Sequence, residues 1–168
     1  RKDPDLFLKP KSWQKENVME PSTVYTTNAE WLDESDRTIF VACSDPRFYP
    51  AHREFVHEHL RLERPASIIV PGGAAQFLWS ASYFFAMQPM VVLLDQKYHI
   101  ERVVAIAHKK CAYYAHKYPH LTDELVVHKQ HSDLHTFKAL ASKLCPRASV
   151  ECFYETPAEK HVQFFRIE

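Results

Sequence analysis

Two stretches decide the fold: TIFVACSDPR at residues 38–47 and RVVAIAHKKC at residues 102–111. Each opens with a continuous apolar run, which is typical of a strand buried on both faces of a parallel sheet. The first run ends at Cys43, and the second leads directly into His108. Ligands of parallel α/β sheets collect beyond the carboxyl ends of the strands, so both side chains are expected at one edge of the sheet.

Three more segments are typical of strands. Residues 67–70 form a short apolar run that ends at a proline and two glycines. Residues 150–155 and 162–167 are rich in β-branched and aromatic side chains and are separated by a polar turn, which predicts a C-terminal β-hairpin or a pair of edge strands.

The segments between the strands predict helices. The expected helices are an amphipathic one over residues 51–63, a buried one over 74–92 bent at Pro89, one from about Cys111 to near Pro119, and one through residues 134–144 with Ser132 as its N-cap. Strands that alternate with helices predict an α/β fold, with a mostly parallel central sheet covered by flanking helices.

The chain has 168 residues, of which 46% are hydrophobic, and this size is enough for one domain with a core. We predict an N-terminal arm over residues 1–35 and a single zinc-binding α/β domain over residues 36–168. The arm is polar and rich in proline, yet it contains Trp13 and Trp31. Because exposed tryptophans are uncommon in free tails, we expect the arm to pack on its own domain or on a partner subunit.

Composition excludes several classes of function. Lys plus Arg and Asp plus Glu both number 21, so neither nucleic acid nor an anionic membrane is an expected partner. No apolar run is long enough to span a membrane, and four cysteines are too few for a disulfide scaffold, so we expect a reduced, cytoplasmic protein. The only glycines, Gly72 and Gly73, cannot form a nucleotide-binding glycine-rich loop. We assign this pair to substrate binding, where the backbone must approach closely.

The residues at the strand ends predict a metal site. His108-x-x-Cys111 places two ligands three residues apart at a helix entry, and Cys43 adds a third. Two thiolates and one imidazole suit zinc, and a site with three protein ligands leaves a fourth position open for catalysis. Asp45, two residues from Cys43, and the neighbouring Arg47 are the expected catalytic pair, and Asp45 is also a candidate fourth ligand.

With both half-motifs in view, the chain resembles the β-class carbonic anhydrases. That family carries C-x-D-x-R after its first strand and H-x-x-C after a later one, as in Cys43-Ser44-Asp45-Pro46-Arg47 and His108-Lys109-Lys110-Cys111. The resemblance covers roughly residues 34–168. It implies zinc held by Cys43, His108 and Cys111, reversible hydration of carbon dioxide to bicarbonate, and a homodimer or higher even oligomer.

The resemblance also implies a division of labour between Asp45 and Arg47. In the open form of the family's site, Arg47 would hold the carboxylate away from the metal, and Asp45 would accept a hydrogen bond from water at the fourth position. In the closed form, Asp45 itself would occupy that position. The motif alone leaves both forms open.

This chain departs from the family pattern around the motif. Ala112-Tyr113-Tyr114 replaces the usual glycines after H-x-x-C, and Glu34 stands near the place of a substrate-facing glutamine. Two alternatives therefore stay open: hydrolysis of carbon disulfide or carbonyl sulfide at the same zinc, and a zinc protein without catalysis. His52 is a further hypothesis, as a route for the proton to leave.

The same residues also allow less specific interpretations. Cys43 and Cys111 could be inert core thiols, and Asp45 with Arg47 a structural ion pair. The histidines at 57, 59, 128, 131 and 135 have ligand-like spacing, but they are more typical of solvated helix faces. Cys145 and Cys152 are expected in the core. Phe48, Phe77 and Tyr113 are either pocket walls or ordinary core residues.

Overall fold

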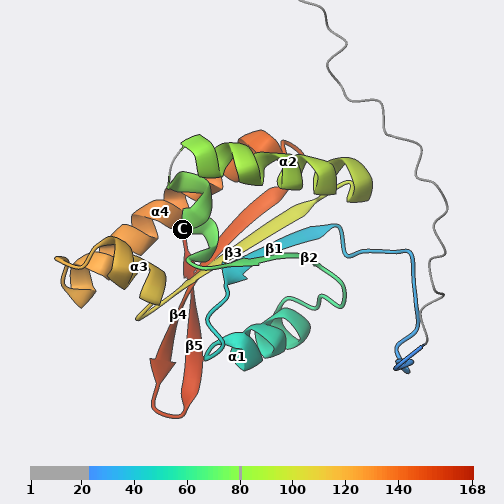
Figure 1. Cartoon of the computed structure of the whole chain (residues 1–168), viewed down its shortest axis with the longest axis horizontal. Coiled ribbons are helices and arrows are strands. Elements are labelled where there is room, and N and C mark those ends of the chain that lie inside the picture. Colours follow the sequence, from blue (N-terminus) through green and yellow to red (C-terminus); the bar gives the residue numbers. More distant parts are fainter. Residues whose placement is uncertain (1–22, 80) are drawn as a thin grey trace, which may run out of the picture. The chain divides into compact units, whose positions relative to one another are not determined.

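One five-stranded sheet runs through the domain in the order β2-β1-β3-β4-β5 (Figure 1). The computed structural model describes residues 23–79 and 81–168. The strands are β1 (Thr38–Cys43), β2 (Ala66–Val70), β3 (Arg102–His108), β4 (Ser149–Ala158) and β5 (His161–Ile167). The first four pair in parallel, and β5 pairs antiparallel with β4 as a terminal hairpin. The predicted α/β fold with a mostly parallel sheet is confirmed.

Helices cover both faces of this sheet (Figure 1). They are α1 (Tyr49–Glu54), a π-helical turn (Phe55–His59), a 3₁₀ turn (Gly73–Leu78), α2 (Ala81–Tyr98), α3 (Ala112–Lys117) and α4 (Asp123–Leu144). Among the described residues, no helix is both long and apolar enough to cross a membrane.

The alternation of side chains along the strands builds two separate core layers. Ile39, Val41, Val103 and Ala105 face α2 and α4, where they pack against Leu134 and other residues. The intervening residues point to the opposite face. There Phe40, Ala42, Val104 and Ile106 pack against the π-helical turn and its C-terminal end, at Phe55, Val56, Leu60 and Leu62.

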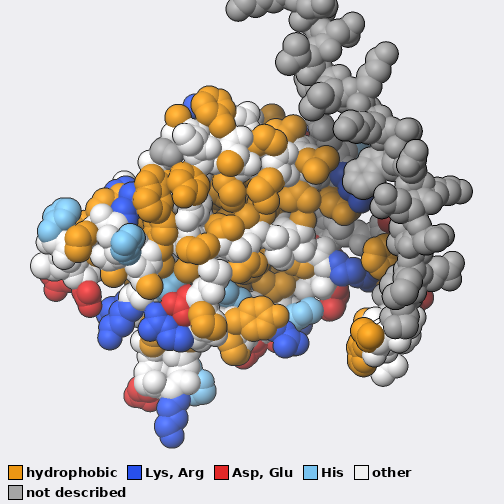
Figure 2. Space-filling model, viewed as in Figure 1, with side chains coloured by type: hydrophobic (Ala, Val, Ile, Leu, Met, Phe, Trp, Pro, Cys, Tyr) orange, Lys and Arg blue, Asp and Glu red, His pale blue; other side chains and the backbone are white. Residues whose placement is uncertain are grey.

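Two helix predictions are wrong in part. The stretch at 74–92 is not one buried helix, because the 3₁₀ turn ends at Leu78 and α2 begins at Ala81. Only Met87 and Val91 of α2 are buried, whereas Phe85 and Leu93 are 67% and 63% exposed. Apolar side chains project from more than one side of α2, but the sheet can cover only one side of the helix. Figure 2 shows hydrophobic side chains gathered where Figure 1 places α2.

The start of the last helix also differs from the prediction. Helix α4 begins at Asp123, and its N-cap is Thr122, whose side chain accepts a hydrogen bond from the Leu125 N–H. Ser132 lies in the middle of the helix. The first turns of α4 carry three consecutive apolar residues, Leu125, Val126 and Val127, of which Leu125 is exposed, so the sequence shows no helical period there.

The chain divides into two units, Arg1–Asp33 and Glu34–Glu168. The packing of the N-terminal arm stays a prediction, and Trp13 lies outside the described residues.

Candidate metal centre

The strand order places the candidate site at the point where the chain changes direction across the sheet. From β1 the chain moves to β2 on one side, and from β2 it crosses back to β3 on the other side of β1. Such switch points leave a crevice beyond the carboxyl ends of the two central strands. Cys43 ends β1 and His108 ends β3, and the parallel register of Val41 with Ala105 makes these two residues neighbours.

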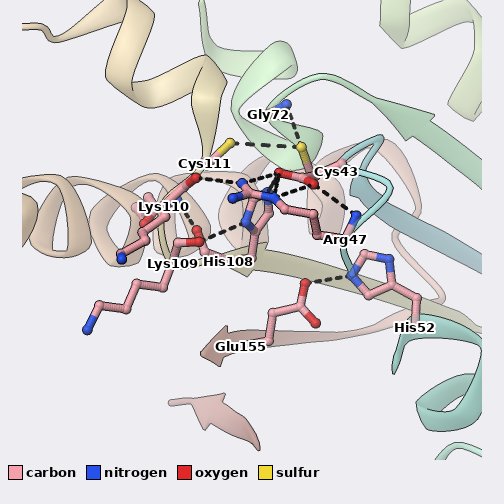
Figure 3. A network of polar contacts seen from close by, with 11 residues as sticks. Cys43, Arg47, His52, Gly72, His108, Lys109, Lys110, Cys111 and Glu155 are labelled. Carbon is pink, nitrogen blue, oxygen red and sulfur yellow. Dashed lines mark hydrogen bonds and ion pairs between the residues drawn. The ribbon is translucent and has the colours of Figure 1, made fainter. Parts of the chain in front are cut away.

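Cys111 reaches the same point through a tight turn. Lys110 takes a positive φ of 58°, and Cys111 then stands as the N-cap of α3. The Sγ atoms of Cys43 and Cys111 lie 3.8 Å apart. The ligand atoms of Cys43, His108 and Cys111 all lie within 4.8 Å of one another, and all three residues are buried (Figure 3). Within residues 23–79 and 81–168, this is the only group of three or more such residues that could hold a metal ion.

The hydrogen bonds of His108 prepare its ring for a metal. Its Nδ1 lies 3.0 Å from the Lys109 carbonyl oxygen, which can only accept, so the proton is on Nδ1. Nε2 is therefore left with a free lone pair, and it is buried without a hydrogen-bond partner among the described residues. The Phe48 ring packs against the imidazole at 4.3 Å, and the Gln130 amide donates to the His108 carbonyl at 2.8 Å. Fixing a histidine through its second nitrogen and its backbone is a common feature of metal sites.

The two sulfurs compete for protons in the absence of a metal. The hydrogen bond from the Cys111 thiol, helped by His108 and the Gly72 N–H, lowers the pKa of Cys43 despite the cost of burial. The same contact with Cys43 raises the pKa of Cys111. Burial opposes a charge on His108, but the adjacent Cys43 thiolate outweighs it and raises the pKa of the imidazole. A divalent cation would remove this conflict by replacing the shared protons, as expected for a zinc-type donor set.

Arg47 lies beside the three candidate ligands (Figure 3) and forms a forked ion pair with Asp45. Arg47 Nε donates to Oδ1 at 3.0 Å, and its terminal nitrogen donates to Oδ2 at 2.6 Å and to the Lys110 carbonyl at 3.1 Å. The Arg47 backbone N–H donates to Oδ1 at 3.0 Å. These hydrogen bonds lower the pKa of Asp45 to about 2. Asp45 Oδ2 lies 4.0 Å from His108 Nε2, so the carboxylate stands next to the ligand group and is held by Arg47.

Gly72 and Gly73 shape the wall of the site. The Gly72 N–H donates to Cys43 Sγ at 3.2 Å, and its φ of 80° is unfavourable for other residues. A Cβ on Gly72 would lie 2.5 Å from the Tyr113 ring, and one on Gly73 would lie 3.0 Å from the backbone of Cys43. Gly72 thus brings its backbone N–H to the Cys43 sulfur, and Gly73 lets the loop pack closely against the backbone at the end of β1. Their predicted role in substrate binding stays a prediction.

Two solved structures resemble this arrangement of strands and helices over most of both chains. The carbonic anhydrase from Glaciozyma antarctica matches with a TM-score of 0.53 at 13% identity, covering 80% of this chain and 83% of that chain. The beta-carbonic anhydrase isoform I from Trichomonas vaginalis gives a TM-score of 0.50 at 10% identity, covering 88% of this chain and 89% of that chain. The chain has a β-carbonic anhydrase-like fold. No family model matches its sequence, and no curated protein sequence does either.

Sequence reasoning missed a buried contact between a histidine and a carboxyl group next to the metal group of this β-carbonic anhydrase-like domain. His52 Nε2 and Glu155 Oε1 lie 2.6 Å apart, with only 6% and 0% of their side chains exposed (Figure 3). Burial raises the pKa of Glu155, and His52 partly offsets this. Glu155 stands in register with His108 on the adjacent strand, but the sequence carries no signal for this pairing. Because His52 is buried, its use as an exit for protons stays a hypothesis.

The remaining candidates lie in the core or apart from the metal group. Cys145 and Cys152 are buried free thiols, and burial raises the pKa of each to about 11. Phe77 packs against Phe137 in the core. In the part of the chain that the structure describes, the histidines at 57, 59, 128, 131 and 135 join no group of three metal ligands.

The ion pair of Asp45 with Arg47 should make the domain sensitive to acid. The folded-state pKa of Asp45 is about 2, below the ordinary value of 3.8 that the unfolded chain would show. The pair therefore stabilises the fold above about pH 4, and this stabilisation is lost as the pH falls toward 2. Urea unfolding of metal-free wild type and of Arg47→Gln should differ most above pH 4, and the difference should shrink toward pH 2.

A matched control for this experiment is Arg53→Gln, at an exposed arginine on α1 with no ion pair among the described residues. Its difference from the wild type should not change with pH. A constant difference between the wild type and Arg47→Gln from pH 6 to pH 2 would contradict the assigned pairing.

Proposed function

We propose that this protein is a zinc-dependent lyase that hydrates carbon dioxide reversibly to bicarbonate. The observation that supports this most is a buried Cys-His-Cys group with a carboxylate beside it, held by an arginine fork in a β-carbonic anhydrase-like fold. Both similar structures are of carbonic anhydrases.

Cys43 Sγ, Cys111 Sγ and His108 Nε2 would hold the zinc. The unpartnered Nε2 and the two sulfurs 3.8 Å apart fit this ion, for which sulfur and imidazole nitrogen are preferred ligands. Three protein ligands leave one position open, as catalytic zinc sites require. Zinc bound there would supply a Lewis acid that activates water at neutral pH.

Asp45 would orient the attacking water, and Arg47 would position Asp45. With a pKa of about 2, the carboxylate is an anion at any working pH and can only accept hydrogen bonds. Arg47 donates to both carboxylate oxygens of Asp45, and its terminal nitrogen also donates to Lys110 O, which holds the guanidinium itself in place. Oδ2 lies 4.0 Å from His108 Nε2 and is the oxygen nearer to the ligand group. We therefore propose that Asp45 assists the fourth position, with Arg47 holding its carboxylate, rather than filling it.

Apolar surface beside the metal group would suit a small uncharged substrate. The Phe48 ring lies against His108, and Ala75 packs with Cys43 and Cys111. Tyr113 lies over Gly72, where the family pattern has glycines after the second half-motif. These three side chains would exclude excess water from the position that carbon dioxide must reach.

Stopped-flow hydration of carbon dioxide tests this function. The zinc-replete wild type should be active between pH 7 and pH 9. Asp45→Asn should keep its zinc and lose about 10–100-fold in kcat/KM. The reason is that the neutral amide at position 45 would replace the charged carboxylate that accepts the hydrogen bond from the attacking water. Cys111→Ser should lose zinc and activity together, whereas the core variant Cys152→Ala should keep both.

Three outcomes of the same experiment would contradict the proposal. Unchanged kcat/KM in Asp45→Asn would remove the assigned role of the carboxylate. Release of sulfide from carbonyl sulfide or carbon disulfide, without hydration of carbon dioxide, would move the substrate to those gases. A wild type that is fully loaded with zinc and turns over none of the three would be a zinc protein without catalysis.

We further propose that the chain assembles as a homodimer or a higher even oligomer. The exposed apolar side chains of α2, Phe85, Met90 and Leu93, support this, because exposed apolar residues gathered on one helix often mark a contact with another chain. Figure 2 shows hydrophobic side chains over this helix. Symmetric association would bury such a face in pairs.

Light scattering tests the oligomeric state. The wild type should have the mass of an even number of chains, and the double variant Phe85→Asp/Leu93→Asp should have a lower mass. Leu125→Asp, at an exposed leucine on α4, is the control and should leave the mass unchanged. A monomeric wild type would contradict the proposal.

A further inference from the structure

A pocket apart from the metal centre lies between the first helical segment and the C-terminal hairpin. It has a volume of about 540 Å³, and its walls come from residues 51–59 on one side and from residues 153–166 on the other. None of the three metal-group residues lines it. The volume lies within the range of small-molecule sites, which is about 300–1,000 Å³.

Aromatic rings form the apolar part of this pocket. Phe55 and Phe164 stack at 4.1 Å with an angle of 9° between their planes, and Phe153 meets Phe55 edge-on at 5.1 Å. Phe55 and Phe153 are nearly buried, and the β5 residue Phe164 is half-buried. Phe164 therefore offers a ring that is partly open to a ligand and already held in place by its neighbour.

The uncommitted charges at this pocket are negative. Glu54 and Glu58 line the helical wall and are exposed, and Glu54 has no ion pair among the described residues. Glu58 has only a 3.5 Å contact with the exposed Arg61. The cation on the opposite wall, Arg166, is already used: it pairs with Glu151 at 2.8 Å and lies over the Phe153 ring at 5.2 Å.

The helical wall is shaped by an irregular turn. The Leu60 N–H donates to the Phe55 carbonyl at 2.9 Å across five residues, which makes Phe55–His59 a π-helical turn. Three residues of this turn, Phe55, Glu58 and His59, line the pocket, and His59 stacks on Phe55 at 4.9 Å. Turns of this kind are rare and often mark functional sites.

We propose that this pocket binds a small organic cation with a flat apolar part, such as an aryl-substituted ammonium. The cationic group faces Glu54 and Glu58, and the apolar part lies on Phe164. Aromatic faces and carboxylates both attract an ammonium group, and an ordered aromatic floor loses little entropy on binding. This site is separate from the metal centre and does not depend on the proposed hydration of carbon dioxide.

Calorimetric titration of the zinc-replete full chain tests this proposal with two ligands of similar size and opposite charge. Benzyltrimethylammonium has no lone pair that could bind zinc, and it should bind with a Kd on the order of a few millimolar or tighter, given its size. Phenylmethanesulfonate should bind at least about tenfold more weakly, because it meets the two carboxylates.

Variants locate the binding site. Glu54→Gln and Glu58→Gln should each weaken binding of the cation by up to about fivefold, and Phe164→Ala by about fivefold. Glu124→Gln, at an exposed acid on α4, is the matched control and should bind as the wild type does. Because Glu54 and Glu58 are exposed, their variants should fold normally, and this can be checked by their thermal unfolding.

Three outcomes would overturn the proposal. The first is equal binding of the anion and the cation. The second is binding of the cation that none of the pocket variants changes. The third is that the cation does not bind. If Phe164→Ala then also has a lower mass than the wild type in light scattering, the pocket is a contact between two copies of the chain.

Discussion

The parallel register between β1 and β3 is the constraint on which the metal centre depends. Val41 and Ala105 are partners in that register, and therefore Cys43 and His108 finish their strands side by side. The strands leave the sheet at its switch point, where no following strand closes the crevice. A shift of one residue in either strand would turn one ligand to the opposite face of the sheet, because side chains alternate with a period of two.

The centre is assembled from both faces of the sheet. His108 and Glu155 lie on the face that α1 covers, where His52 and Phe48 surround them. Cys43 lies on the other face with Cys111 and Ala75. The candidate metal site is thus enclosed by protein on two sides. The buried Nε2 of His108, which has no hydrogen-bond partner among the described residues, is the atom that a metal ion would satisfy. An orphaned nitrogen in the interior costs free energy unless a ligand satisfies it.

The sequence was sufficient for the sheet and for the group of three residues that could hold a metal ion, because their signals are local. Buried parallel strands are short apolar runs; Cys43 and His108 stand at the ends of two of them, and Cys111 follows His108 by three residues. The sequence did not reveal the pairing of His52 with Glu155, because residues 103 positions apart meet only through the register of β4 with β3. The exposure of α2 was also missed. An apolar helix looks the same in sequence whether its second face is covered by the same chain or left open.

Zinc K-edge X-ray absorption of the zinc-loaded protein tests the central claim most directly. The account predicts two sulfur ligands at about 2.3 Å and two nitrogen or oxygen ligands at about 2.0–2.1 Å. A first shell with three or four sulfurs would contradict it, because Cys145 or Cys152 would then close the site. A shell without sulfur would show that Cys43 and Cys111 do not hold the metal.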